Sequence, residues 1–277
     1  MKKEYILLVL LITLTSFSQI NWKRNNAEEV LPVELFHATY AINLPTAETI
    51  GARELEIEIS HRFIPTINSG SKNLWGFDGP VTNRLALGYG ITDNTQITFG
   101  RSNYHDNYEL SVKQKLFEDN NETLPVIVTA MGGVSWNTDY PLVESSDSKA
   151  FQFFAQAIFN TMYDKKLALG VVPSYLYNSH PECLDNQYSF TIGTYLQYYI
   201  SDALSLIWEY NPTVTGWRDF HNPMGFGLEI ETGGHFFKVF ITNSTDLNQT
   251  QFLSGADKSF NDGDVRFGFM ITRLLFL

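Results

Sequence analysis

The residues with the clearest capacity for chemistry are charged side chains that alternate with apolar ones. In the stretch RELEIEISHRF, residues 53–63, an extended chain puts Glu56, Glu58 and Arg62 on one side and an apolar row on the other. The same alternation gives further inward candidates in other runs: Arg84, Glu109, Lys113, Glu209, Glu229, Glu231 and Arg266. These side chains are the candidate charges of an enclosed interior.

Charges of both signs on one face have two uses. Paired with each other, they form an ion-pair network that fills a narrow barrel, as side chains fill small barrels generally. If these charges instead face water, they form a charged constriction that selects solutes. Inward glycines such as Gly88, Gly90 and Gly193 leave room for the second use. Both interpretations stay open from the sequence.

The sequence predicts no catalytic residue, cofactor or metal site. The 6 histidines are scattered without the spacing of metal ligands. Ser60 and His61 are neighbours, so a strand points them to opposite faces, and neither His-x-Ser nor G-x-S-x-G occurs. The single Cys183 excludes an intramolecular disulfide. A lipid enzyme would need a nucleophile and a base brought together from distant strands.

These charges lie in strand-like runs, each bounded by Gly, Asn, Asp or Pro. We expect strands over 53–63, 83–91, 95–102, 107–117, 124–136, 150–163, 166–177, 187–200, 203–211, 222–232, 235–243 and 263–277. The fold class is therefore all-β, and these runs predict a single antiparallel barrel of 12 strands.

The links between the strands alternate in length. Short turns lie at 92–95, 118–123, 164–166, 201–203 and 232–234. Longer links lie at 64–82, 137–149, 178–186, 212–221 and 244–262, with one short exception at 103–106. Short periplasmic turns and longer extracellular loops are typical of outer-membrane barrels, and an even strand count puts both termini on the short-turn side.

The apolar face of these runs favours contact with lipid. In residues 151–163 one face has aromatic residues on either side of small aliphatic ones, as expected where rings lie at the two membrane interfaces. The strands of a β-sandwich also alternate polar and apolar residues, so alternation alone does not distinguish the two folds. The length of the runs and the unequal lengths of the links favour the barrel. The run 235–243 is apolar on both faces; we expect Lys238 inside, with Phe237 and Val239 toward lipid.

The chain begins with the features of a secretory signal. Lys2 and Lys3 precede the apolar run Ile6–Leu14, and small residues follow, which predicts a signal peptide over 1–18. The run is shorter than the roughly 20 residues of a spanning helix. We expect export through the general secretory pathway to the outer membrane. Residues 19–52 are then either a periplasmic leader or a plug in the lumen, and 53–277 form the barrel.

Residues 45–63, PTAETIGARELEIEISHRF, also carry a family resemblance. NLWGFDG (73–79), NRLALGYGITDNTQITFGRS (83–102) and ELSVKQKL (109–116) continue it in the same order. These pieces resemble the Bacteroidota family of outer-membrane β-barrels named domain of unknown function 5777. The resemblance covers about 37–136 clearly and implies an outer-membrane barrel, with no substrate and no catalytic residues.

The sequence therefore predicts a porin-like protein. The leading hypothesis is a passive channel for small solutes through a charged lumen. The first alternative is a closed barrel with a structural or binding role through acidic loops, and the second is a membrane-embedded lipid enzyme. The net charge of −11 argues against nucleic acid. Outer-membrane lipid is the expected partner; the solute and any protein partner are not named by the sequence.

Overall fold

The computed structural model describes residues 34–276, so the predicted signal peptide and residues 19–33 lie outside the described part. Thirteen strands form one antiparallel sheet. They are β1 (Glu54–Phe63), β2 (Val81–Thr92), β3 (Thr95–Ser102), β4 (Asn107–Asp119), β5 (Val126–Asn137), β6 (Phe151–Tyr163), β7 (Leu167–Tyr177), β8 (Tyr188–Ser201), β9 (Leu204–Tyr210), β10 (Thr213–Gly216), β11 (Met224–Glu231), β12 (His235–Thr242) and β13 (Arg266–Phe276).

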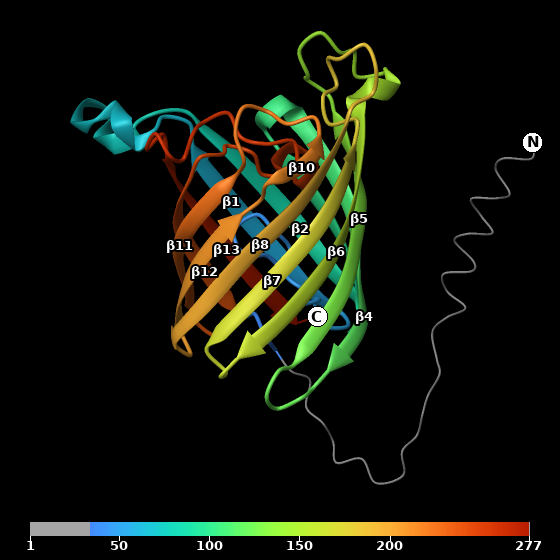
Figure 1. Cartoon of the computed structure of the whole chain (residues 1–277), viewed down its shortest axis with the longest axis vertical. Helices are drawn as coiled ribbons and strands as arrows, with labels where there is room; N and C mark the ends of the chain where they lie inside the picture. The colour runs from blue at the N-terminus through green and yellow to red at the C-terminus, as the bar shows by residue number, and fades with distance from the viewer. Residues whose placement is uncertain (1–33, 277) are drawn as a thin grey trace, which may run out of the picture. The chain divides into compact units, whose positions relative to one another are not determined.

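The sheet closes on itself as a barrel of 12 strands (Figure 1). Each strand pairs with its neighbours in the chain, except that β9 pairs with β11 and the first strand, β1, pairs with the last, β13. The short β10 instead extends the edge of β8. The predicted all-β barrel and its strand count are confirmed, because period-two alternation is a local property that a single sequence carries.

The ends of the barrel differ, as the link lengths predict. Short turns join β2 to β3, β4 to β5, β6 to β7, β8 to β9 and β11 to β12 at one end, which we call the short-turn end (Figure 1). The other end, the long-loop end, carries the short helices η1 (Ile67–Ser69), η2 (Ser71–Gly76), η3 (Tyr104–Asp106), η4 (Ser148–Ala150) and α2 (Gln249–Phe252). No helix within 34–276 has the length and apolar character needed to cross a membrane.

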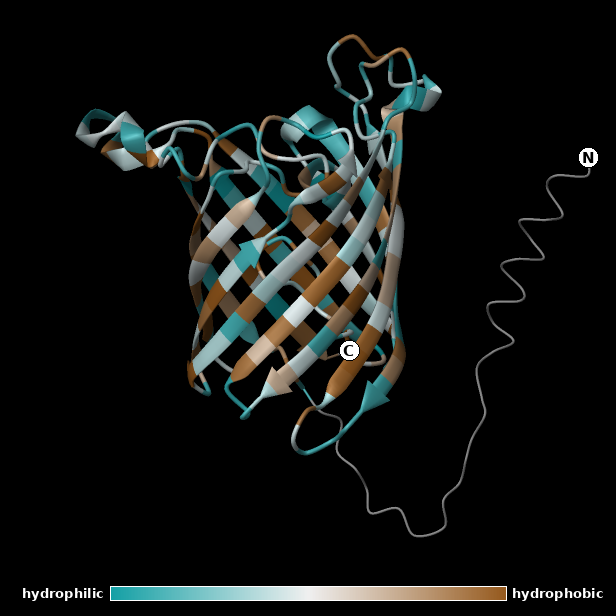
Figure 2. Ribbon diagram, in the orientation of Figure 1, coloured by the Kyte–Doolittle hydropathy of each residue, from teal (hydrophilic) through white to brown (hydrophobic). Residues whose placement is uncertain are grey.

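The outer face of the wall is apolar. Figure 2 shows the alternation directly, with apolar and polar residues forming a checkerboard along the strands. On β12, Phe237 and Val239 are exposed whereas Phe236, Lys238 and Phe240 are buried, which confirms the predicted facing of this strand. Apolar side chains exposed around a closed β-wall fit a lipid surface rather than water.

Two segments fill the inside of this wall. The plug segment, residues 34–52, precedes β1, and apolar residues such as Leu35, Ile42 and Leu44 within it are fully buried. The β12–β13 loop, residues 243–265, folds inward from the long-loop end and buries Phe252 and Leu253. The two segments meet where Gln249 Nε2 donates to the Asn43 carbonyl oxygen at 2.7 Å. Of the predicted segment 19–52, the described part thus lies in the lumen.

The inward glycines make room for the plug segment rather than for solute. A Cβ atom added at Gly193 would lie 2.7 Å from the Leu44 methyl carbons, and one at Gly88 would lie 2.5 Å from the Ile50 methyl carbon. At Gly90 the added atom would lie 1.9 Å from the Gly51 carbonyl oxygen. The space that these glycines leave in the wall is therefore occupied.

Candidate functional site

The alternation of the strands puts the candidate charges on the inner face of the wall. Nine of the ten sequence candidates are almost completely buried: Glu56, Glu58, Arg62, Arg84, Glu109, Lys113, Glu209, Glu229 and Arg266. Glu231 is the exception. It is half-buried at the end of β11, and its carboxylate accepts from the Gly233 backbone N–H at 2.7 Å. Glu231 therefore belongs to a turn at the short-turn end.

The buried charges occupy one side of the barrel. All of those described lie on β9, β11, β12, β13, β1, β2 and β4, which together with β3 form a contiguous arc of the wall that we call the charged arc. The inner faces of β5 to β8 contribute apolar and neutral polar side chains instead. Ile158, Val172 and Leu176 from this uncharged arc pack with Leu35 and Leu44 of the plug segment. The lumen thus has one charged wall and one uncharged wall, in which apolar and neutral polar side chains are mixed.

Glu209 of β9 holds the tight turn of the plug segment. Its Oε2 atom accepts from the backbone N–H groups of Ile42, Asn43 and Leu44, at 3.2, 2.8 and 2.8 Å. Its Oε1 atom accepts from Asn43 Nδ2 at 2.9 Å. Successive N–H groups that converge in this way form a natural binding site for an anion, and here the carboxylate of the wall supplies that anion.

Lys113 of β4 binds the carbonyl side of the same segment. Its Nζ atom donates to the backbone oxygens of Thr39, Thr46 and Glu48, at 2.9, 3.2 and 3.0 Å. Glu56 of β1 accepts from Thr39 Oγ1 at 2.8 Å. A buried ammonium group with three acceptors has its donors satisfied. Among residues 34–276, Lys113 thus fixes the plug segment without a carboxylate at ion-pair distance.

The two arginines of β1 and β2 reach the two lumen segments through asparagines. Arg62 Nη2 donates to Asn43 Oδ1 of the plug segment at 2.9 Å. Arg84 Nε donates to Asn248 Oδ1 of the β12–β13 loop at 2.7 Å. Arg84 Nη1 also lies 2.6 Å from Glu58 Oε1, with both side chains buried. Glu58 and Arg84 are therefore a true ion pair.

Glu229 of β11 is the centre of a second network. Lys238 Nζ lies 3.1 Å from its Oε2 atom, and Gln197 Nε2 donates to its Oε1 atom at 2.6 Å. The plug segment contributes His37, whose Nδ1 atom lies 3.6 Å from Glu229 Oε1. Burial lowers the pKa of His37, but the hydrogen bond and charge of Glu229 outweigh burial and raise it. The ion pair thus favours the protonated imidazole.

The remaining charges anchor the β12–β13 loop. Glu109 accepts from Ser135 Oγ at 3.1 Å and from the Thr250 backbone N–H at 3.3 Å. Arg266 makes a two-point contact with Asp257, at 2.8 and 2.7 Å. Both segments that fill the lumen are therefore held by inward charges, and few of these charges face an open space.

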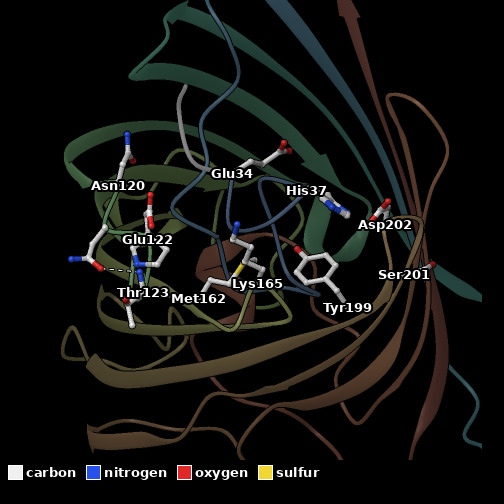
Figure 3. Close-up of a pocket in the computed structure, with 12 residues that line it drawn as sticks. Glu34, His37, Asn120, Glu122, Thr123, Met162, Lys165, Tyr199, Ser201 and Asp202 are labelled. Carbon is white, nitrogen blue, oxygen red and sulfur yellow. Dashed lines mark hydrogen bonds between the residues drawn. The ribbon is translucent and has the colours of Figure 1, made fainter. Parts of the chain in front are cut away.

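A cavity of about 700 Å³ lies at the short-turn end. Figure 3 shows Glu34 and His37 of the plug segment beside Tyr199, with Lys165 and Met162 facing the same space. The Tyr199 hydroxyl donates to the Leu35 carbonyl oxygen at 3.0 Å, which joins the cavity wall to the plug segment. Because Glu34 and His37 belong to its lining, this cavity ends at the plug segment.

A smaller cavity, of about 180 Å³, lies at the long-loop end. It includes Asp219, Asp246 and Asp257 together with Trp217 and other aromatic residues. The plug segment and the β12–β13 loop lie between the two described cavities, as their contacts with the wall require. The lumen is therefore hollow near each end and packed in between.

The alternation along the strands predicts the inward charges but not the residues that these charges contact in the lumen. Asn43 and Asn248 are not marked by charge or by alternation, yet each accepts from a buried arginine. The available signal was composition. The stretch 244–254 is rich in Asn, Gln and Thr with Leu247 and Phe252 among them, unlike the charged loops elsewhere. Amides with interspersed apolar residues suit a polar but enclosed lumen.

Solved structures show the same fold. The COG4313 outer membrane channel from Pseudomonas putida F1 is 13% identical, with a TM-score of 0.50 over 83% of this chain and 98% of that one. The NanC porin is 11% identical, with a TM-score of 0.49 over 80% and 99%. LpxR from Salmonella typhimurium has a TM-score of 0.36 at 10% identity over 79% and 99%, too low to support an argument. No curated protein matches the chain.

Residues 36–275 match a family described as membrane bound beta barrel domain, DUF5777, which includes the plug segment almost completely as well as the barrel. The protein is thus a membrane-bound β-barrel whose fold resembles that of an outer membrane channel. The sequence resemblance is confirmed, and the chain belongs to the DUF5777 family of membrane-bound β-barrels.

Proposed function

We propose that the protein is an outer-membrane channel for small solutes that its own plug segment closes in the conformation described. In this proposal the long loops face the exterior and the short turns face the periplasm, the usual arrangement of such barrels. Solutes pass between the plug segment and the charged arc when the polar contacts of the plug segment separate.

The observation that supports a channel is the charged arc itself. A permanently packed interior gains little from buried charges, because apolar side chains of similar volume are often as stabilising or more so. The charged arc binds the plug segment through hydrogen bonds that water can replace, such as those of Glu209 and Lys113. The uncharged arc holds the same segment both through apolar packing and through buried hydrogen bonds of Thr129, Asn160 and Tyr195. The plug segment can therefore leave one wall while it stays on the other.

The test is single-channel recording of the purified protein in a planar bilayer. Glu209→Gln replaces an acceptor of three backbone N–H groups with a neutral amide, which weakens the plug contacts by about 2 kcal/mol. We expect brief openings of the wild-type protein and an open fraction about thirtyfold higher in this variant. Glu231→Gln is the matched control, since the hydrogen bonds that the Glu231 carboxylate accepts within residues 34–276 come from its own turn. It should leave the open fraction unchanged.

Silence of both variants in bilayers, with insertion shown by protease protection of the barrel, would exclude the channel. Equal effects of the two substitutions would also contradict it, because a nonspecific change in charge would then explain the openings.

A closed barrel with a binding role is the second candidate. The apolar cluster that joins Leu35, Phe36 and Leu44 to Ile158 and Leu176 supports it, since this cluster resembles the core of a permanently filled barrel. Failure of the conductance experiment would favour this role. A lipid enzyme gains no support at Ser60 and His61, because Ser60 is buried inside whereas the His61 ring stacks outside on Phe269. We propose no catalytic activity.

A further inference from the structure

The cavity at the long-loop end is built by five separate links and one strand. Its volume of about 180 Å³ corresponds to roughly six water molecules. The lining comprises Tyr104, His105, Tyr140, Gln152, Ser179, His180, Trp217, Asp219, Thr245, Asp246, Gln251, Ser254 and Asp257. Because the lining comes from so many parts of the chain, the folded barrel assembles this cavity as a unit.

The charge of the cavity is negative. Asp257 is neutralised by its two-point contact with Arg266. Asp246 is half-buried, and its Oδ2 atom accepts only from Ser244 Oγ at 2.9 Å. Within the described residues, neither Asp246 nor Asp219 has a cationic partner at ion-pair distance. Two carboxylates therefore remain without a counter-charge.

Buried acceptors without partners line the same cavity. Gln251 is 6% exposed; its Nε2 atom donates to the Tyr104 carbonyl oxygen at 2.7 Å, which fixes the amide and leaves Oε1 without a donor. Ser179 is 2% exposed, and its Oγ atom has no partner within the described part of the chain. A buried polar atom without a partner is costly, so these atoms are arranged for a donor from outside the chain.

Aromatic rings complete the lining. The His105 ring lies 4.1 Å from that of Tyr104 and 4.2 Å from that of Tyr140, measured between centroids. On the opposite loops, the His180 and Trp217 rings meet edge to face at 4.5 Å. Faces of Tyr and Trp rings attract organic cations. Carboxylates, unpaired acceptors and ring faces thus all favour one chemical type of ligand.

We propose that this cavity binds a small organic cation that carries N–H donors, a guanidinium or primary ammonium compound. Its N–H groups would contact Asp219, Asp246 and the Gln251 amide oxygen, and its apolar part would lie against the rings. The carboxylates of the described residues do not converge into a metal-ligating cluster, which favours a ligand larger than a bare ion. Binding at this cavity does not depend on conduction through the lumen.

The probe is methylguanidinium chloride, titrated calorimetrically into the full chain purified from membranes in detergent. The neutral molecule N-methylurea, of nearly the same shape, is the comparison. We expect saturable binding of methylguanidinium and affinity for N-methylurea that is at least about tenfold weaker, since loss of the charge removes the charge-assisted hydrogen bonds. Equal binding of the two probes, or binding of neither, would overturn the proposal.

Asp246→Asn and Asp219→Asn should each weaken methylguanidinium binding about tenfold. Asp262→Asn makes the same change of charge in the β12–β13 loop, where Asp262 is exposed and outside the cavity lining, and should leave binding unchanged. The heat-dependent gel mobility of each variant reports whether the barrel is folded. An equal loss in Asp262→Asn would show that the general field of the loops, rather than the cavity, attracts the cation.

Discussion

Asn43 binds both carboxylate oxygens of Glu209, through its backbone N–H at 2.8 Å and its side-chain Nδ2 atom at 2.9 Å. The remaining amide oxygen of Asn43 accepts from Arg62 at 2.9 Å. One asparagine of the plug segment therefore joins β9 to β1, two strands separated by three others in the wall. This bridge ties the plug segment to two separate strands of the charged arc.

A steric change should open the lumen without any change of charge. Gly193→Val places methyl groups where the Leu44 side chain packs, since even a Cβ atom there lies 2.7 Å from it. Overpacking typically costs about 1–3 kcal/mol, so we expect a higher open fraction in bilayer recordings. Gly132→Val is the control, because a Cβ atom at Gly132 has its nearest contact at 3.4 Å. No difference between the two variants would contradict the role of Leu44 in closure.

The His37–Glu229 contact should make plug retention depend on pH. Because the pKa of His37 is raised above 6.5 in the folded protein, its contribution to stability is complete below about pH 6.5. The contribution is lost as the pH rises through the folded pKa. Urea unfolding of the wild-type protein and of His37→Gln, measured from pH 6 to pH 8.5, should show a difference that shrinks with rising pH. A difference that is constant would exclude the charged imidazole as the cause.

Cation binding at the long-loop cavity should strengthen as the pH rises. Burial, together with the charges of Asp257 and Asp219, raises the pKa of Asp246 to about 7 despite the Ser244 hydrogen bond. Other ionisable groups of the cavity and its border are Tyr104, His105, Tyr140, His180 and Arg266. Affinity for methylguanidinium is expected to rise about tenfold between pH 6 and pH 8, as the carboxylate ionises.

Calorimetry with Asp246→Asn separates this effect from the titration of the two histidines. The variant should lose most of the pH dependence. Full retention of the dependence would assign it to His105 or His180, whose protonated rings repel a cation.

Depth in the membrane can be read from charged substitutions on the outer face. Leu87 is exposed near the middle of β2, and Leu116 is exposed near the short-turn end of β4. Leu87→Arg should lower the free energy of unfolding in lipid vesicles by about 2–4 kcal/mol, and Leu116→Arg by at most about 1 kcal/mol. Equal costs at both positions would argue against a lipid-facing wall centred on Leu87.

The strands and the inward charges were predictable because each depends on neighbours two residues away. The outcome at β11 shows the limit of that signal. Glu229 and Glu231 share a face, but Glu229 joins the buried network whereas Glu231 binds its own turn, since the alternation gives facing and not depth. The hydrogen bond between Asn43 and Glu209 joins residues 166 positions apart. Most of the donors to the Glu209 carboxylate are backbone N–H groups, which nearly every residue has. Such contacts leave no pattern in a single sequence.

The two segments inside the lumen are attached to the two strands that close the barrel. The plug segment runs directly into β1, the β12–β13 loop runs directly into β13, and β1 pairs with β13. The pairing of β1 with β13 closes the sheet around both segments. The plug segment and the β12–β13 loop must therefore enter the lumen before this pairing forms, or while it forms. Contacts of such long sequence separation form slowly.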